Sequence, residues 1–308
     1  MALTVVGSMA FDAIETPFGK IDKIVGGSAT YIAYAASHYI RPIHQVSIVG
    51  VDFPDTELQQ LSDRGVNISG VERRTDKKSF FWSGRYHLDM NSRDTLVTEL
   101  NVLEDFDPVL PESALESEFL MLGNLHPGIQ KRVINQFKKR PKLIVMDTMN
   151  FWMENAMPEL EETLKLVDVL MINDSEARQL SAQYSLVKAA KSILEMGPKY
   201  LVIKKGEHGA LLFHEDKVFF APALPLEDVF DPTGAGDTFA GGFIGYLAKS
   251  GTVSFDKMKN AIIIGSALAS FCVEKFGPRK LKEISKEDIE SRVRNFVQLV
   301  NFDIQLTS

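Results

Sequence analysis

The sequence predicts a single α/β domain with three layers, in which a doubly wound, mostly parallel sheet carries a small β-sheet lid. Three observations predict it. Short apolar runs rich in β-branched residues alternate with longer segments of helical period along the 308 residues. The strand candidates are apolar throughout, which is typical of strands covered by helices on both faces. One stretch, 70–103, breaks the alternation and lacks a helical period.

The main sheet is expected from seven apolar segments, at 3–8, 45–50, 119–124, 142–148, 169–173, 200–206 and 210–214. Helices are expected between them at 28–40, 55–64, 127–139, 153–166, 174–182 and 185–196. The C-terminal part has helical period at 235–249, 255–275 and 285–298. Strands joined by helices favour parallel pairing, because a parallel connection needs a long crossover. No repeat, low-complexity tract or linker divides residues 1–308, which indicates one domain.

The lid is predicted from two inserted segments, 11–25 and 70–103. Within 70–103 the runs SFFWSGRYH and TLVTELNVL flank the polar turn DMNSRD, as in an antiparallel hairpin. The segment FDAIETPFGKIDKIV, residues 11–25, has the same short-strand pattern. Together they could form a β-flap over one edge of the body. Two ordinary surface insertions are the alternative.

Composition and charge exclude several classes of protein. The chain has 34 basic and 41 acidic residues and a net charge of −7, which disfavours a general nucleic-acid binder. No stretch reaches the roughly 18 apolar residues that a membrane helix needs, and the start MALTVVGSMAFD lacks a basic leader. The only cysteine, Cys272, lies in an apolar run and cannot form an intramolecular disulfide. A cytoplasmic protein that binds neither nucleic acid nor membrane is expected.

The segment DPTGAGDTFAGGF, residues 231–243, carries the clearest chemical signal. Thr233-Gly234-Ala235-Gly236 has small side chains at a helix start, where backbone N–H groups and the helix dipole can hold an anion. Asp237 beside it is either a helix cap or a base. A base next to an anion hole suits phosphorylation of a hydroxyl group.

The chain lacks the motifs of three other classes of nucleotide-binding protein. The chain contains no G-x-x-x-x-G-K-[ST], which disfavours a Walker-type NTPase. It also lacks the HRD and DFG motifs of protein kinases. No G-x-G-x-x-G follows the first strand, so a dinucleotide-dependent oxidoreductase is disfavoured.

The same segment resembles the C-terminal signature of the ribokinase-like (PfkB) sugar and nucleoside kinases, and the resemblance extends over residues 2–300. VVGSMAFD is similar to the first strand with its substrate aspartate, and VGGSATYIAYAAS to the Gly-Gly motif. MINDSEARQL resembles the Asn-x-x-Glu motif, and KKGEHGALLF the nucleotide-side strand and turn. The resemblance implies a doubly wound α/β body with a β lid, consistent with the pattern above.

The resemblance also implies roles for individual residues. Asp237 is expected to be the general base, and Gly234, Ala235 and Gly236 the anion-hole donors. The substrate-binding residues that it implies are Asp12, Gly26, Gly27 and Asn124. The nucleotide-binding residues that it implies are Asn173, Lys205, Gly206, Gly209, Thr233 and Asn260. Glu176 is expected to hold Mg²⁺, largely through water. Lys204 stands where many family members have Thr.

ATP and Mg²⁺ are therefore the expected cofactors, and the resemblance leaves open whether a monovalent cation also binds. The expected acceptor is a small sugar or sugar acid, phosphorylated on a hydroxyl or hydroxymethyl group. Ala10, Ser28 and Tyr31 replace polar residues of the ribokinases, so simple ribokinase activity is in doubt. A nucleoside kinase is the alternative. A non-catalytic regulator on this fold is disfavoured by the intact Asp237. Lids in this family often pair between subunits, which is compatible with a homodimer.

Overall fold

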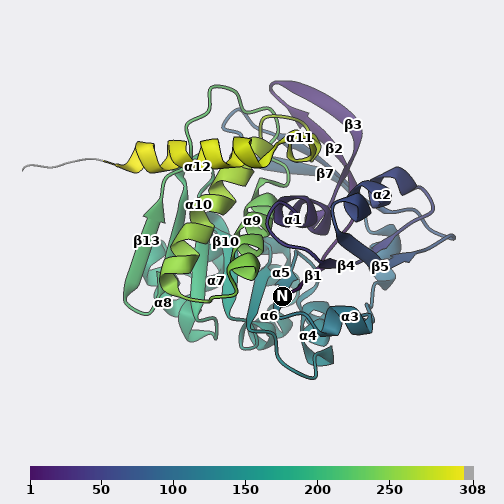
Figure 1. Ribbon diagram of the computed structural model, residues 1–308, viewed down its shortest axis with the longest axis horizontal. Helices are drawn as coiled ribbons and strands as arrows, with labels where there is room; N and C mark the ends of the chain where they lie inside the picture. The colour runs from purple at the N-terminus through teal and green to yellow at the C-terminus, as the bar shows by residue number, and fades with distance from the viewer. Residues whose placement is uncertain (302–308) are drawn as a thin grey trace, which may run out of the picture.

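A nine-stranded sheet runs through the middle of the protein in the computed structural model, which describes residues 1–301 (Figure 1). The spatial order is β13-β12-β11-β10-β9-β8-β1-β4-β5. The bounds are Leu3–Val6 for β1, Ile43–Val49 for β4, Val66–Arg73 for β5, Phe119–Leu122 for β8, Leu143–Asp147 for β9, Val169–Asn173 for β10, Tyr200–Lys204 for β11, Ala210–His214 for β12 and Lys217–Ala221 for β13. The strands from β11 to β5 pair in parallel, whereas β12 and β13 are antiparallel. This confirms the predicted α/β fold.

Helices cover both faces of the sheet, as its buried strands require. One face carries α1 (Ser28–Ala36), α2 (Asp55–Asp63), α9 (Ala235–Ser250), α10 (Phe255–Cys272), α11 (Arg279–Glu283) and α12 (Lys286–Val300). The other carries α3 (Glu112–Leu115), α4 (Pro127–Gln136), α5 (Asn150–Asn155), α6 (Met157–Leu164), α7 (Asp174–Ser181) and α8 (Leu186–Glu195). Successive strand residues alternate between the two cores, so that Val5 belongs to one and Val6 to the other. None of the helices in residues 1–301 combines the length and hydrophobicity needed to span a bilayer.

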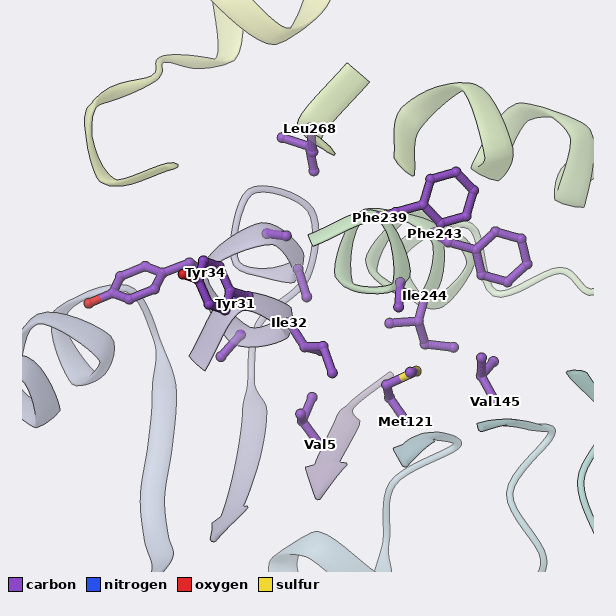
Figure 2. Close-up of a cluster of buried hydrophobic side chains, with 14 of the residues drawn as sticks. Val5, Tyr31, Ile32, Tyr34, Met121, Val145, Phe239, Phe243, Ile244 and Leu268 are labelled. Carbon is purple, nitrogen blue, oxygen red and sulfur yellow. The ribbon is translucent and has the colours of Figure 1, made fainter. Parts of the chain in front are cut away.

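Helix α9 is held centrally by close packing on α1. In Figure 2, Ile244 of α9 points toward Met121 of the sheet, whereas Phe239 and Phe243 point away from Tyr31 and Ile32 of α1 into the rest of the same core. Gly241 faces the backbone of α1, where an added Cβ would lie 2.5 Å from the carbonyl oxygen of Ile32. The glycine therefore permits a closer approach of the two helices than any side chain would. This contact fixes the start of α9 over the sheet.

A second, four-stranded sheet, which we call the lid, projects from one end of the body (Figure 1). Its strands are β2 (Ala10–Thr16), β3 (Gly19–Gly26), β6 (Phe80–Tyr86) and β7 (Arg93–Glu99), in the order β3-β2-β6-β7. The central pair, β2 and β6, is parallel, and the outer pairs are antiparallel.

Three boundaries differ from the sequence-based expectations. Residues 70–73, expected in the lid segment, belong to β5 because this strand follows α2 and pairs in parallel with β4 at the edge of the main sheet. The helix expected at 153–166 is divided into α5 and α6, with Pro158 in the first turn of α6, where a missing N–H costs nothing. Strand β13, which was not predicted although residues 218–221 are apolar, pairs with β12 as a hairpin.

The strand order places a topological switch point between β1 and β8. From β1 the chain builds β4 and β5 on one side, and it then returns to build β8 through β11 on the other. Such a reversal separates the loops at the carboxyl ends of the two adjacent strands, and ligands of open α/β sheets bind there.

Candidate active site

The predicted site residues lie mainly at the carboxyl ends of the parallel strands. Asn124 follows β8, Asn173 ends β10, and Asp12 lies in β2, which follows β1 after a short loop. Two further residues that sequence analysis did not assign to the site, Asp147 and Lys204, end β9 and β11. Parallel strands bring all these ends to one edge of the sheet, next to the start of α9.

The start of α9 forms the expected turn. Gly234 caps the helix with φ 74°, a left-handed conformation that favours glycine, and a side chain there would collide with the ring of Tyr31. The N–H of Ala235 donates to Pro232 O at 3.1 Å. The N–H groups of Gly234 and Gly236 have no acceptor among residues 1–301. They are therefore free to bind an anion at the positive end of a 16-residue helix.

A buried carboxylate anchors this turn. Asp231 accepts a hydrogen bond from the N–H of Thr233 and another from the N–H of Gly277, each at 2.9 Å. Burial raises the pKa of Asp231, although both hydrogen bonds oppose the rise. The carboxylate thus joins the anion-hole turn to the segment after α10.

Asp237 has the electrostatic properties of a base at neutral pH. Burial and then the negative charge of Asp147 raise its pKa to about 7, against the lowering effects of Lys204 and Arg93. A carboxyl group with a pKa near the working pH can both accept and release a proton. It follows the free amide donors directly in the first turn of α9.

Lys204 provides a cation beside the free amides. Its Nζ lies 3.3 Å from Asp147 Oδ1 and 3.1 Å from the place where a Cβ on Gly236 would stand. Burial lowers its pKa, but the carboxylates of Asp147, Glu176 and Asp237 together outweigh burial and raise it. The ammonium group therefore stays charged with its side chain only 17 % exposed. The neighbouring Lys205 instead directs its Nζ over the ring of Phe220, 5.9 Å from the centroid.

Asn173 and Glu176 form a reciprocal cap at the start of α7. Asn173 Oδ1 accepts from the N–H of Glu176, and Glu176 Oε2 accepts from the N–H of Asn173, both at 2.8 Å. Burial, and next the charge of Asp147, raise the pKa of Glu176 to about 7. Its other oxygen, Oε1, accepts no hydrogen bond from residues 1–301. The pair is therefore a structural cap that still leaves one carboxylate oxygen available.

The acceptor end of the site is built around Asp12. Its carboxylate lies against Gly26, where a side chain would collide with it, and the nearby backbone N–H of Gly27 lowers its pKa. Burial, followed by the charges of Asp231 and Asp237, raises its pKa to about 8. The hydroxyl of Tyr31 is buried and has no partner among residues 1–301.

An aromatic wall adjoins Asn124. The indole Nε1 of Trp152 donates to Asn124 Oδ1 at 2.9 Å, and the rings of Trp152 and His126 stand 5.1 Å apart, edge to face. His126 caps α4 by accepting from the N–H of Gly128 at 3.0 Å. Trp152 was missed by sequence analysis because its helix, α5, carries no motif. Its position after the end of β9 was the available signal.

The predicted nucleotide-side residues lie further along the chain. Gly206 begins a short 3₁₀ turn, Gly206–His208, and Gly209 follows it with φ 84°. Asn260 lies in α10, where its Nδ2 donates to the hydroxyl of Tyr246 at 3.3 Å. Thr233 Oγ1 donates to the hydroxyl of Tyr86 in the lid at 3.2 Å. The lid therefore touches the anion-hole turn directly.

A carboxyl group beside free amide donors suits the transfer of a phosphoryl group to an alcohol. The family model of the pfkB family carbohydrate kinases matches residues 2–284, so the chain belongs to this family. The cytidine kinase of Thermococcus kodakarensis is 31% identical over 248 residues, which are 79% of this chain and 87% of that protein. The nucleoside kinase of Methanothermobacter thermautotrophicus is 26% identical over 306 residues, covering 89% of this chain and 90% of its own.

Solved structures agree with the fold. A nucleoside kinase of Methanocaldococcus jannaschii superposes with a TM-score of 0.76 at 20% identity, over 96% of this chain and 98% of its own. Arabidopsis thaliana ribokinase, in complex with ribose and ATP, gives a TM-score of 0.77 at 20% identity, over 96% and 99%. The fold and the family are thus those predicted from the sequence.

Proposed function

We propose that the protein transfers the γ-phosphoryl group of ATP to a hydroxyl or hydroxymethyl group of a small sugar. The acceptor oxygen forms a bond to the γ-phosphorus as the bond from that phosphorus to the bridging oxygen of ADP breaks. The hydroxyl proton passes to Asp237, and the products are a phosphomonoester and ADP. The observation that carries the proposal is the carboxyl group of Asp237 directly beside two free amide donors at the start of α9.

On the donor side, Gly234 and Gly236 would hold the transferred phosphoryl group, with Ala235 completing the turn. Lys204 would contribute a positive charge from the sheet side, because its Nζ stands beside Gly236. Thr233, Asn173, Gly206, Gly209 and Asn260 remain our proposed nucleotide contacts. Between the two adjacent lysines, the geometry favours Lys204 over Lys205 as the phosphate ligand.

The residues present suit a magnesium ion that is held mostly by phosphates and water. Residues 1–301 contain no cluster of three or more metal-ligating side chains, but Glu176 Oε1 is unbonded. Mg²⁺ commonly keeps several waters and uses one or two carboxylates. Glu176 would hold it, and when bound the ion would neutralise phosphate charge.

On the acceptor side, Asp12 would accept hydrogen bonds from two sugar hydroxyls, with Gly26 and Gly27 allowing close approach. The buried hydroxyl of Tyr31 has no partner among residues 1–301, and Asn124 is held by a hydrogen bond from Trp152. Both could contact the acceptor. Three carboxyl groups, Asp12, Asp231 and Asp237, influence one another electrostatically here.

A nucleoside is the second candidate acceptor. The aromatic wall of Trp152 and His126 next to Asn124 could stack on a nucleobase. Two relatives are named as a cytidine kinase and a nucleoside kinase, which supports this reading for the present chain. In that case Asp12 would bind the ribose hydroxyls, and Asp237 would act on the 5′-hydroxyl.

The deciding experiment measures ADP release with Mg-ATP across neutral sugars, sugar acids, phosphosugars and nucleosides, with and without K⁺. We expect one acceptor class to stimulate turnover strongly, and the Asp237→Asn protein to lose that stimulation. Turnover with nucleosides alone would select the second candidate. ATP binding without stimulation by any acceptor would support a regulator instead of a kinase.

We also propose a homodimer formed through the lid. All seven residues of the edge strand β7 are exposed, including Leu96 and Val97. An exposed apolar edge strand is a ready partner for a second sheet. Light scattering should give twice the chain mass, falling to one mass in Leu96→Lys, whereas a monomeric parent protein would contradict the proposal.

A further inference from the structure

The turn between β6 and β7 joins the lid to both loops of the donor side. At its base, Tyr86 accepts a hydrogen bond from Thr233 in the anion-hole turn. Near its tip, Asn91 packs so closely on Gly206 that a side chain on this glycine would collide with it. The turn is itself ordered by Asp89, which accepts from the N–H groups of Asn91 and Ser92 at 3.1 and 2.9 Å.

The strand register sets the direction of Arg93, the first residue of β7. Arg93 is the cross-strand partner of Tyr86 in this antiparallel pair. Directly opposed residues place their side chains on the same face of a sheet. Since the Tyr86 hydroxyl reaches Thr233, Arg93 also projects from the face of the lid that covers the donor site.

The charge of Arg93 acts on the site. It lowers the pKa of Asp12, Asp237 and Glu176, three carboxyl groups on different elements. Yet Arg93 forms no ion pair within 4.0 Å in the part of the chain that the structure describes. Its guanidinium group lies near the ring of Trp82, with Cζ 5.7 Å from the ring centroid, and near the hydroxyl of Tyr86, whose pKa burial raises and this charge lowers. Arg93 is thus an exposed guanidinium group, on the lid face that covers these carboxyl groups, that can donate to an anionic ligand.

We propose that Arg93 of the lid contacts the transferred phosphoryl group and stabilises its charge, opposite Lys204 and the amides of α9. The inference rests on the proposed kinase function. In the transfer described above, Arg93 neither gives nor takes a proton. Its five N–H donors would bind the equatorial oxygens of the phosphoryl group while the bond to the acceptor forms and the bond to ADP breaks.

Arg85 supplies a matched control on the same hairpin. It precedes Tyr86 and therefore projects to the opposite face of the lid, where its Nε donates to Glu15 Oε1 at 2.8 Å. Replacing either arginine by alanine removes one positive charge from the same hairpin. Only the Arg93 change removes it from the donor site.

The test compares Arg93→Ala, Arg93→Lys and Arg85→Ala with the parent protein under saturating Mg-ATP and the acceptor found in the panel. We expect Arg93→Ala to lower kcat by about 100-fold or more, within the range for arginines that stabilise phosphoryl transfer, with KM for the acceptor changed by less than about 5-fold. Added guanidinium ion should restore part of this loss, and Arg93→Lys should keep part of kcat. Arg85→Ala should stay within about 2-fold of the parent protein.

The outcomes separate the two proposals. No acceptor-dependent turnover in the parent protein would remove the kinase function itself, and the role of Arg93 with it. An active parent protein with unchanged kcat in Arg93→Ala would overturn only the role of Arg93. A raised acceptor KM at constant kcat would make Arg93 an acceptor ligand, which also overturns the proposal. Thermal unfolding of each variant identifies any loss that comes from misfolding.

Discussion

The two sheets of the molecule differ in how their strands are covered, and the difference decides how firmly each strand holds its functional groups. All residues of β8 and β9 in the main sheet are buried, whereas all residues of β7 in the lid are exposed. Groups at the ends of buried strands have positions fixed by the packing of two cores. Groups on the lid are positioned by a few polar contacts, such as the bond between Thr233 and Tyr86. We therefore expect substitutions in the two sheets to have different kinds of effect.

The largest expected effect on turnover comes from a residue that the packed body positions, Asp237. Asp237→Asn should lower kcat by about three orders of magnitude or more, because it removes the base and its negative charge while leaving the fold intact. Steady-state ADP release measures this, with Asp256→Asn on the exposed first turn of α10 as a control. Turnover within 10-fold of the parent protein would contradict the role of Asp237 as the base.

The two adjacent lysines give the next comparison. Lys204→Met should lower kcat by about 100-fold, since it removes a buried charge beside the anion hole, while Lys205→Met should have a smaller effect. The reverse order would restore the sequence-based choice of Lys205. Kinetics at saturating ATP distinguish lost catalysis from weakened nucleotide binding.

The pH dependence tests the same buried cluster. Asp237 must be ionised to accept a proton, so kcat/KM should rise with pH and level off above its pKa of about 7. Asp147 raises this pKa, while Lys204 and Arg93 lower it. Lys204→Met and Arg93→Ala should therefore move the acid limb to higher pH. A limb near pH 4 in the parent protein would show that Asp237 is not desolvated.

Replacing Asp12 should increase the stability of the protein while it weakens acceptor binding. Asp12 has a folded pKa of about 8 against an ordinary value of 3.8, so its contribution to stability is present at low pH and lost as pH rises through about 8. Asp12→Asn should raise the melting temperature at pH 8 by at least about 2 °C, with little change at pH 4. It should also raise the acceptor KM. A lower melting temperature at pH 8 would contradict the shift.

The last comparison makes the same change, valine to alanine, once in each sheet, and the change in the lid is expected to have the smallest effect. Val145→Ala in β9 removes buried methyl groups and should cost about 2–3 kcal/mol of unfolding free energy. Val97→Ala in β7, where the residue is 42% exposed in the single chain, should cost less than about 0.5 kcal/mol when made in the Leu96→Lys protein, which we expect to be a monomer. Denaturant unfolding measures both. A larger loss at Val97 would indicate that another surface covers the lid in solution.

The same division explains what could be predicted from the sequence. Apolar strands and the Gly-rich turn before Asp237 depend on local pattern, so the fold and the motif-bearing ends of strands were predictable. The lid was predictable as hairpin-like segments, but 70–73 carry an alternating pattern that also suits an edge strand, and only pairing with β4 decides their place. The break between α5 and α6 is explained by Pro158, which favours the first turn of a helix and which sequence analysis overlooked.

The charges around the base were not predictable in the same way. Asp147 lies in a plain strand end, and its effect on Asp237 requires β9 and α9 to meet in space. Lys204 and Lys205 are adjacent in sequence, and which one faces the site depends on the phase of β11 at its end. The direction of Arg93 depends on its pairing with Tyr86 across a turn. These are properties of long-range register, which a single sequence does not display.

The close contact of α1 and α9 has a consequence for how such a protein can diversify. Gly27 caps α1 near Asp12, and Gly234 caps α9 near Asp237, so under the proposed function one helix start would serve the acceptor and the other the phosphoryl group. Because Gly241 lets α9 pack closely on α1, the distance between the two helix starts is set by the packing of the body. Loops and lid residues around it can then change to admit new acceptors while the distance over which the proton moves stays the same.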